Sequence, residues 1–211
     1  MRNQCNPVKT SKLSSLLAGP VKNGYSPVCT KNSTSKKILE LGALTDFGLN
    51  LREYEWIPND NYQADGFTIK TGDFLVSRSN ALNKVGRAAL YRGGLSNCSY
   101  PDLIMKFRVD ESKINLDFLE VFLQSSFARK HFMQRISGTS NSMVKITKVT
   151  IEQLSVPVLD LNEQKAIATI LQTWDTAIKK TETLIAAKQK RFEWLINQLI
   201  SSQKKKDLVS L

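Results

Sequence analysis

The chain has 211 residues, 41% of them hydrophobic, which is enough for one good core and a long helix. A formal net charge of +11 suggests a polyanionic partner, most often nucleic acid, although a solvated basic surface gives the same count. There is no apolar run of transmembrane length and no signal-peptide core, and the three cysteines lack the spacing of a metal site or a disulfide framework. We therefore expect a cytoplasmic protein with free thiols.

Turn signals are frequent in the opening part of the chain. Residues 1–35 are rich in Ser, Asn, Thr and Lys, and the turn dipeptide Asn23-Gly24 lies among several prolines, so we expect a loop-rich opening segment. Residues 36–41 form the first predicted strand. Residues 42–66 are again expected to be irregular.

Short strand-like runs then alternate with turn residues. They cover residues 67–69, 73–77, 86–91 and 103–109. A polar, basic loop, residues 78–87, separates the second run from the third. This pattern predicts a small sheet with exposed connections.

Helical signals follow the last of these strands. Asn115 is placed to cap a helix that runs from Leu116 to about residue 135. A second polar loop and a short run, residues 143–146, lead to a short helix that is expected to begin at Thr150. Asp160 and Glu163 then have the spacing of a capping box at the start of a longer helix.

The last quarter of the chain is its most regular part, because residues 161–203 contain neither Pro nor Gly. Apolar residues recur at alternating steps of four and three, the 3.5-residue period of a coiled-coil seam. Two seam positions, Thr181 and Lys188, are polar, which weakens packing but helps to fix register. The apolar seam positions are Ile167, Leu171, Trp174, Ile178, Ile185, Phe192, Leu195 and Leu199.

These patterns predict an α+β protein with two parts. The first is a globular domain over residues 1–158, with short strands and a helix. The second is a long coiled-coil-like helix over residues 159–211 that must find a partner for its apolar stripe.

Five stretches, in this order, resemble the specificity subunits of type I restriction–modification systems. They are residues 21–27, residues 39–46 with 57–58, residues 72–80 with 85–90, residues 137–139 with 156–158, and residues 161–171. The resemblance implies a DNA target-recognition domain followed by a spacer helix. It also implies that the chain is not itself an enzyme and that its partners are double-stranded DNA, methyltransferase subunits and restriction subunits.

One departure from that family concerns chain length. Its members usually contain two recognition domains and two spacer helices, whereas this chain has one of each. It therefore resembles a half-subunit that pairs with itself or with a second half. Two such helices packed antiparallel would bury the seam and place the two recognition domains at opposite ends, and the resemblance implies that methyltransferase subunits dock on the spacer.

Two polar clusters have side chains suited to DNA. Arginine and asparagine can each make two hydrogen bonds to a base edge, and lysine and small hydroxyl or amide groups suit phosphate oxygens. The competing interpretation is a solvated hairpin for the first cluster and a turn that satisfies its own backbone for the second. The first cluster is Arg78, Asn80, Asn83, Lys84 and Arg87, and the second is Thr139, Ser140, Asn141 and Lys145.

A stand-alone Mg²⁺-dependent endonuclease with a coiled-coil dimerisation arm is the enzymatic alternative. Pro101-Asp102 followed by Glu111-x-Lys113 fits the loose pattern of many nucleases, although Asp110 to Lys113 also reads as a turn before the helix. A silent cassette that donates its recognition domain by recombination is a third hypothesis. We find no methyltransferase signature, cofactor loop or Walker-type loop, so we expect no cofactor, no metal and no catalytic residue of the chain's own.

Overall fold

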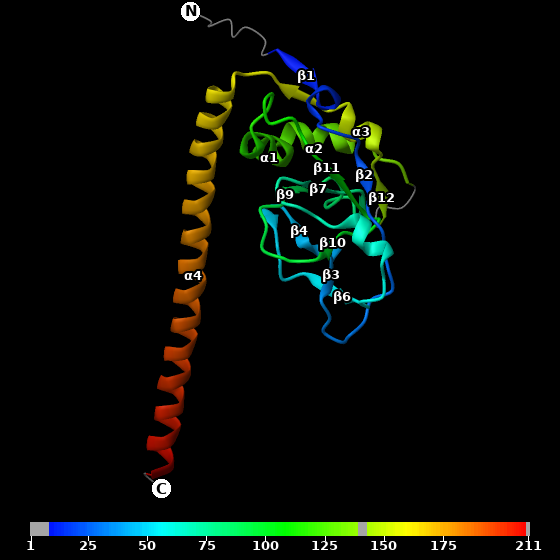
Figure 1. Ribbon diagram of the computed structural model, residues 1–211. Coiled ribbons are helices and arrows are strands. Elements are labelled where there is room, and N and C mark those ends of the chain that lie inside the picture. Colours follow the sequence, from blue (N-terminus) through cyan, green and yellow to red (C-terminus); the bar gives the residue numbers. More distant parts are fainter. Residues whose placement is uncertain (1–8, 139–142, 210–211) are drawn as a thin grey trace, which may run out of the picture. The chain divides into compact units, whose positions relative to one another are not determined.

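The computed structural model describes residues 9–138 and 143–209, with the side chains of residues 201–209 excepted. The chain divides into two compact units, Met1–Ala166 and Ile167–Leu211. We call the described parts of these units the head and the arm. The head mixes short strands with helices, and the arm continues a single long helix, so the predicted α+β class is confirmed (Figure 1).

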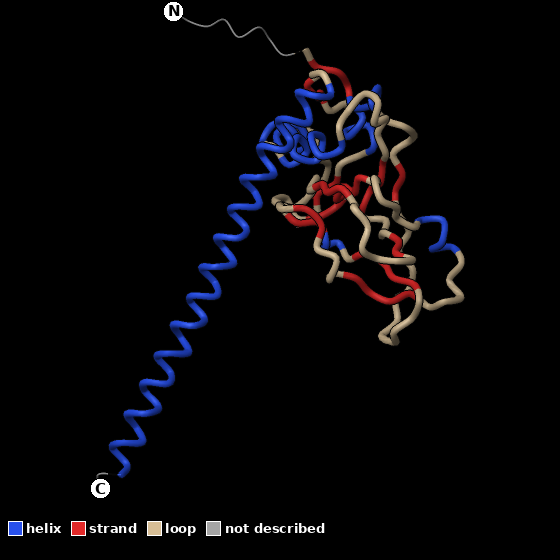
Figure 2. The backbone as a smooth tube through the Cα atoms, turned by 60° about the vertical axis from the view of Figure 1, so that its left-hand side comes forward, coloured by secondary structure: helices blue, strands red, loops and turns tan. Residues whose placement is uncertain are grey.

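The strands of the head are short and are connected by turns and loops, as Figure 2 shows. The strands are β1 (Thr10–Lys12), β2 (Lys22–Asn23), β3 (Lys36–Leu39), β4 (Leu44–Thr45), β5 (Gly48–Leu49), β6 (Tyr54–Ile57), β7 (Phe74–Ser77), β8 (Ser79–Asn80), β9 (Ala88–Leu90), β10 (Cys98–Ser99), β11 (Ile104–Phe107), β12 (Val144–Lys145) and β13 (Ser155–Pro157). The helices are the 3₁₀ turns η1 (Leu13–Leu16), η2 (Leu41–Ala43) and η3 (Gln63–Phe67), and the α-helices α1 (Leu116–Gln124), α2 (Ser126–Met133), α3 (Lys148–Glu152) and α4 (Leu161–Val209).

A four-stranded antiparallel sheet, in the order β2-β11-β7-β9, forms the centre of the head. Every residue of β7 is buried, and Phe74 stacks on Phe107 of β11 with ring centroids 5.2 Å apart. Helix α1 packs on β9, where the carboxylate of Glu120 accepts the Leu90 amide at 2.9 Å. The predicted strands over residues 73–77, 86–91 and 103–109 are thus confirmed as β7, β9 and β11.

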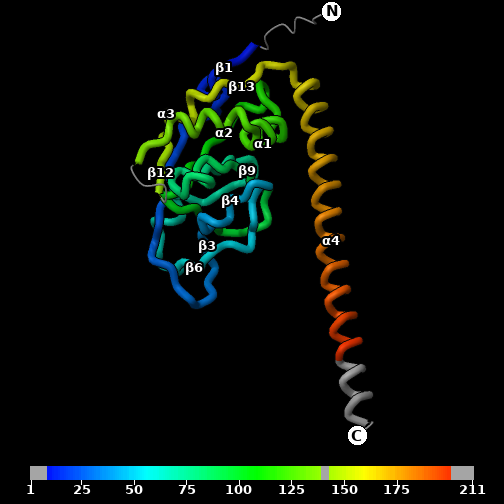
Figure 3. The backbone as a smooth tube through the Cα atoms, turned by 180° about the vertical axis from the view of Figure 1, so that it is seen from behind, coloured from blue at the N-terminus to red at the C-terminus, as the bar shows by residue number. Residues whose placement is uncertain are grey.

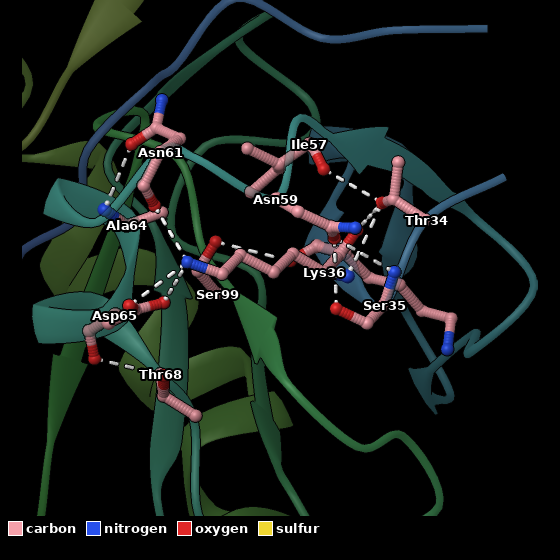
Figure 4. A network of polar contacts seen from close by, with 11 residues as sticks. Thr34, Ser35, Lys36, Ile57, Asn59, Asn61, Ala64, Asp65, Thr68 and Ser99 are labelled. Carbon is pink, nitrogen blue, oxygen red and sulfur yellow. Dashed lines mark hydrogen bonds and ion pairs between the residues drawn. The ribbon is translucent and has the colours of Figure 1, made fainter. Parts of the chain in front are cut away.

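A second sheet has the order β10-β3-β6. Strand β3 confirms the strand predicted over residues 36–41, but β6 lies in a region expected to be irregular. A network of polar contacts holds the loops at this sheet (Figure 4). In it, Thr34 donates to the Ile57 carbonyl at 2.7 Å, and Lys36 Nζ lies 2.7 Å from Asp65.

The strand predicted over residues 67–69 is wrong. Phe67 ends η3, and in this run only Thr68 pairs, through an isolated bridge to Ser99. The Thr68 hydroxyl donates to the Asp65 carbonyl at 3.0 Å, which closes a turn in place of an extended segment.

The single helix predicted over residues 116–135 is two helices. Asn115 caps α1 as expected, because its side chain accepts the Phe118 amide at 3.0 Å. Ser125, however, has an extended backbone, with ψ at 159°, and its hydroxyl accepts the Ala128 amide at the start of α2. A side chain that favours N-caps therefore interrupts an otherwise continuous apolar pattern.

The opening segment is more ordered than predicted. Strand β1 pairs antiparallel with β13, which lies just before α4 in the chain, as Figure 3 shows. Asn23-Gly24 is not a hairpin turn, because Asn23 pairs with Met105 in the central sheet. A Cβ on Gly24 would overlap the carbonyl oxygens of Tyr100 and Pro101, so the chain can pass here only with glycine.

The cap predicted for the short helix near residue 150 is displaced. Helix α3 begins at Lys148, Thr147 is its N-cap, and Thr150 completes the capping box as the third helical residue. At α4 the predicted capping box is confirmed, because Asp160 Oδ1 accepts the Glu163 amide at 3.1 Å and Glu163 Oε2 accepts the Asp160 amide at 3.2 Å. Within the described residues, no helix combines the length and the apolar character that crossing a lipid bilayer requires.

Candidate nucleic-acid interface

A two-stranded ribbon made by β8 and β12 brings parts of the two predicted DNA-contacting clusters together. Val144 pairs with Asn80, and Lys145 pairs with Ser79. The Ile146 amide also donates to the Arg78 carbonyl at 2.9 Å. We call this feature the β8–β12 ribbon, and it brings together polar residues from two segments that are distant in the sequence.

Arg78 and Asn80 are half-buried at one side of the ribbon. One guanidinium nitrogen of Arg78, Nη1, lies 3.4 Å from the Asp102 carbonyl oxygen, and its other donors have no protein partner among the described residues. The Asn80 side chain accepts the Ala81 amide at 2.8 Å and donates weakly to Ser77 at 3.4 Å. Both side chains are therefore oriented locally while keeping hydrogen-bonding capacity.

Lys145 is exposed at the other side of the ribbon. Its backbone exchanges two hydrogen bonds of 2.8 Å with Ser137, so the strand that carries it is fixed. Thr139, Ser140 and Asn141, the other members of the second cluster, lie outside the described residues.

Asn83 and Lys84 are exposed on a turn beside the ribbon. Arg129 of α2 holds this turn, because its guanidinium donates to the carbonyls of Leu82, at 2.5 Å, and Val85. Burial and the neighbouring Arg87 guanidinium lower the pKa of Arg129. Arg129 was not predicted from the sequence, because its two acceptors are backbone groups in a distant segment of the chain.

Arg87 lies in a different environment from the rest of its cluster. Its guanidinium makes a two-point ion pair with Asp46, with Nε 2.7 Å from Oδ1, and its side chain is only 20% exposed. A pocket of about 380 Å³ lies between the β4–β5 turn and α2, lined in part by Arg87 and Arg129. The role of Arg87 in DNA contact stays a prediction.

The residues of the nuclease pattern lie at different ends of β11. Asp102 precedes that strand and accepts the Ser26 hydroxyl at 2.6 Å. Glu111 and Lys113 follow it, in a turn where Lys113 pairs with Asp110 at 3.0 Å. In the part of the chain that the structure describes, no three His, Cys, Asp or Glu side chains gather as a metal site would need.

The predicted seam residues of α4 are all exposed, from Ile167 at 37% to Leu199 at 69%. Other large apolar side chains of the same helix are exposed as well, among them Ile170, Leu184 and Trp194. An apolar stripe of this length on one helix is typical of a surface that packs against another helix.

Comparison with known proteins identifies the family. The family described as "Type I restriction modification DNA specificity domain" matches residues 9–205, which includes the head and most of the arm. The chain belongs to this family.

Two curated relatives are similar to this specificity-domain chain. A putative type I restriction enzyme MjaX specificity subunit of Methanocaldococcus jannaschii is 25% identical over 175 residues, and the match covers 80% of this chain and 41% of that protein. The type I restriction enzyme EcoEI specificity subunit of Escherichia coli is 21% identical over 137 residues, 63% of this chain and 23% of the relative. The chain thus spans less than half the length of these relatives.

Solved structures share the fold of this specificity-domain chain. The HsdS subunit from Thermoanaerobacter tengcongensis aligns with a TM-score of 0.64 at 16% identity, covering 92% of this chain and 50% of that one. The S subunit of a type I restriction-modification system from M. genitalium aligns with a TM-score of 0.60 at 17% identity, covering 90% and 45%. At these identities the likeness concerns the fold.

Proposed function

We propose that the chain is a non-catalytic, half-length specificity subunit. Its head binds double-stranded DNA and reads one half-site. Its arm joins the chain to a second copy and presents a docking surface to methyltransferase and restriction subunits. The observation that carries the proposal is the family match, which extends through both the head and the arm, over residues 9–205.

The β8–β12 ribbon supports the DNA-binding part of the proposal. Arg78, Asn80 and Lys145 lie in or next to its strands, with Asn80 and Lys145 on opposite faces, and these are the side-chain types that read guanine, adenine and phosphate. Thr139, Ser140 and Asn141 lie in the sequence between Ser137 and Lys145, which are paired. These residues therefore belong, in this proposal, to the same recognition surface.

The exposed seam supports self-association through an antiparallel pair of arms. In the heptad notation, Leu171, Ile178, Ile185, Phe192 and Leu199 occupy a positions, and Ile167, Trp174, Thr181, Lys188 and Leu195 occupy d positions. In one antiparallel register, every seam pair toward the two ends of the helix pair consists of two large apolar residues. This register joins Ile167 to Leu199, Leu171 to Leu195, and Trp174 to Phe192 of the second copy.

The same register gathers the polar seam residues near its two-fold axis, at about residue 183. There, Thr181 meets Ile185, and Lys188 meets Ile178 of the second copy. A shift by one heptad toward the end of the chain would place Leu171 opposite a serine and Ile167 opposite a lysine. Polar seam residues thus favour one register at some expense in stability.

Cysteine pairs test this register in a background with the native cysteines replaced by serine. A mixture of Leu171→Cys and Leu195→Cys chains should form a mixed disulfide dimer, because the two positions are opposite each other. Leu171→Cys alone should remain uncrosslinked, because its copies lie far apart in an antiparallel pair. Crosslinking of Leu171→Cys with itself would instead indicate parallel arms and contradict the proposal.

Genome-wide methylation mapping tests the function itself. Cells that express this chain with its neighbouring methyltransferase are compared with cells that lack only this chain. An interrupted methylated motif that vanishes with the chain would establish it as the specificity determinant, and symmetric half-sites would indicate a homodimer. Identical methylomes, with both proteins present, would contradict the proposal.

A cleavage assay tests the endonuclease alternative. Mg²⁺-dependent DNA cleavage by the purified chain, abolished by Asp102→Ala, would support that alternative.

A further inference from the structure

A basic pocket of about 250 Å³ lies at the edge of the central sheet where β2 pairs with β11. Its walls come from residues 18–20, residues 66–67, Tyr100 and Phe107, together with four charged side chains. Three of these are the cations of Lys22, Lys106 and Arg108, and the fourth is the carboxylate of Asp73. The lining is therefore positively charged overall, which favours an anionic ligand.

Asp73 fixes the inner part of this pocket. Its carboxylate is 1% exposed and lies 2.5 Å from Arg108 Nε and 3.1 Å from Lys106 Nζ. Arg108 Nη2 also donates to the Thr71 carbonyl at 2.7 Å, and Lys106 Nζ donates to the Thr68 carbonyl at 3.0 Å. One edge of the Arg108 guanidinium is thus immobilised, while Nη1 has no protein partner among the described residues.

Lys22 lies at the outer part of the pocket. It pairs directly with Lys106 across the antiparallel β2–β11 ladder, so both side chains project from the same face. Lys106 and Arg108 share the single charge of Asp73, so part of their positive charge stays uncompensated, and the exposed ammonium of Lys22 has no partner in the described part of the chain. Like charges opposite each other in a ladder destabilise it, and an anion beside them would remove that repulsion.

An aromatic wall completes the pocket. The Phe67 and Tyr100 rings meet edge to face with centroids 6.2 Å apart, and Lys106 Nζ lies 5.3 Å from the centroid of the Tyr100 ring. Burial raises the pKa of Tyr100 to about 12, so its hydroxyl stays protonated and adds no negative charge. The wall excludes water on one side, which strengthens the interaction of the cations with an anion.

We propose that this pocket binds a phosphate group between the free edge of Arg108 and the ammonium of Lys22. Arg108 supplies pre-oriented donors and Lys22 supplies a second charge. The phosphate belongs either to a DNA backbone or to a free nucleotide, since both present the same chemistry. The site lies apart from the β8–β12 ribbon, because Asp73 precedes β7 and Arg78 follows it, about 16 Å along an extended strand.

The first experiment titrates inorganic phosphate into the full chain. NMR follows the backbone amide and arginine Nε–H signals. The Arg108 Nε–H and Lys22 amide signals should shift with phosphate and saturate. Lys22→Gln should weaken binding about tenfold, since a hydrogen bond to a charged group is lost. Lys130→Gln on α2 removes the same charge from an exposed position outside the pocket and should leave the affinity unchanged. Shifts that do not saturate, or that respond equally to both variants, would overturn the proposal.

Arg108→Gln leaves Asp73 with one fewer partner and can unfold the chain, so the Lys22→Gln variant is the one that tests the proposal.

Two competition experiments distinguish the sources of phosphate. If the pocket takes a DNA phosphate, a short duplex should displace inorganic phosphate. Lys22→Gln should then weaken binding to all duplexes alike and reduce the salt slope by about one. If it takes a nucleotide, a nucleoside triphosphate should displace phosphate and the duplex should not. Methylation mapping tests the proposed function separately from either result.

Discussion

Gln164 and Asn115 join the first turn of α4 to the N-cap of α1. The Asn115 amide donates to Gln164 Oε1 at 2.7 Å, and Gln164 Nε2 donates to the Leu159 carbonyl at 3.0 Å. The Gln164 side chain is 2% exposed, so each of these groups would lack water if its partner were removed.

Gln164→Ala should therefore lower the free energy of unfolding of the head by about 1–3 kcal/mol, the penalty for leaving buried polar groups unpaired. Asn162→Ala, on the exposed side of the same helical turn, should change it by less than about 0.5 kcal/mol. Denaturant unfolding of both variants measures the difference. Equal effects would show that Gln164 does not stabilise this junction.

The two arginines of the first predicted cluster should behave differently. If Arg78 reads a base, Arg78→Gln should cost about 1–3 kcal/mol of DNA affinity and relax specificity at one position. Arg87→Gln should chiefly lower stability, because Arg87 is paired with Asp46. DNA-binding isotherms and unfolding curves for both variants separate the two roles. A larger loss of affinity in Arg87→Gln would place the contact surface elsewhere.

Ser79 offers a test of stability inside the ribbon. Its Oγ is buried and has no hydrogen-bond partner among the described residues, whereas Ser77 Oγ accepts from Asn80 at 3.4 Å. Ser79→Ala should leave stability unchanged or raise it by up to about 1 kcal/mol, and Ser77→Ala should lower it. Thermal unfolding compares the two serines. A marked destabilisation by Ser79→Ala would show that this hydroxyl has a partner.

His131 is the single histidine of the chain, so its titration can be followed without ambiguity. Burial lowers its pKa below the usual 6.5, although the hydrogen bond from Nε2 to the Thr150 carbonyl, at 2.8 Å, opposes this effect. Arg135 and Lys12 lower the pKa further. The folded state thus binds the proton more weakly than the unfolded chain, and its stability should fall as the pH drops below 6.5. NMR titration should give a pKa below 6.5, and His131→Gln should flatten the loss of stability between neutral and mildly acidic pH.

The arm should act as a ruler between the two heads of a dimer. Deletion of residues 179–185 removes one heptad, which shortens the helix by about 10 Å at about 1.5 Å per residue. At about 3.4 Å per base pair, the gap between half-sites should shrink by about three base pairs. Methylation mapping of the deletion variant reads the gap directly. An unchanged gap in an assembled, active complex would contradict this role of the arm.

Local signals predicted the elements whose stability is local. Asn115 and Asp160 were identified as caps because a cap needs only its own side chain and the next turn. The buried run around Phe74 was identified as a strand because its neighbours are turn residues. The long helix α4 was predicted because residues 161–203 contain neither Pro nor Gly.

The remainder depends on contacts between distant residues. Arg87 pairs with Asp46, and Arg129 holds carbonyls of the turn at Leu82, and no local pattern encodes either contact. Ser125 is an exception, because the N-cap that outweighs helix periodicity there is a local contact with Ala128. The pocket around Asp73 was missed because its cations come from two strands and the loop after β11, and its carboxylate from a further segment.

The pairing of Ser137 with Lys145 holds the two ends of a segment together without depending on the residues between them. Both ends of the intervening segment are fixed by backbone hydrogen bonds, which are indifferent to side-chain identity. Closing a loop becomes only about 0.6 kcal/mol more unfavourable when its length doubles. Gly138, whose φ is +128°, and the buried Val144 should stay constant, whereas insertions between them should be tolerated by the fold. If the segment contacts DNA as proposed, it offers a route by which new target preferences can evolve.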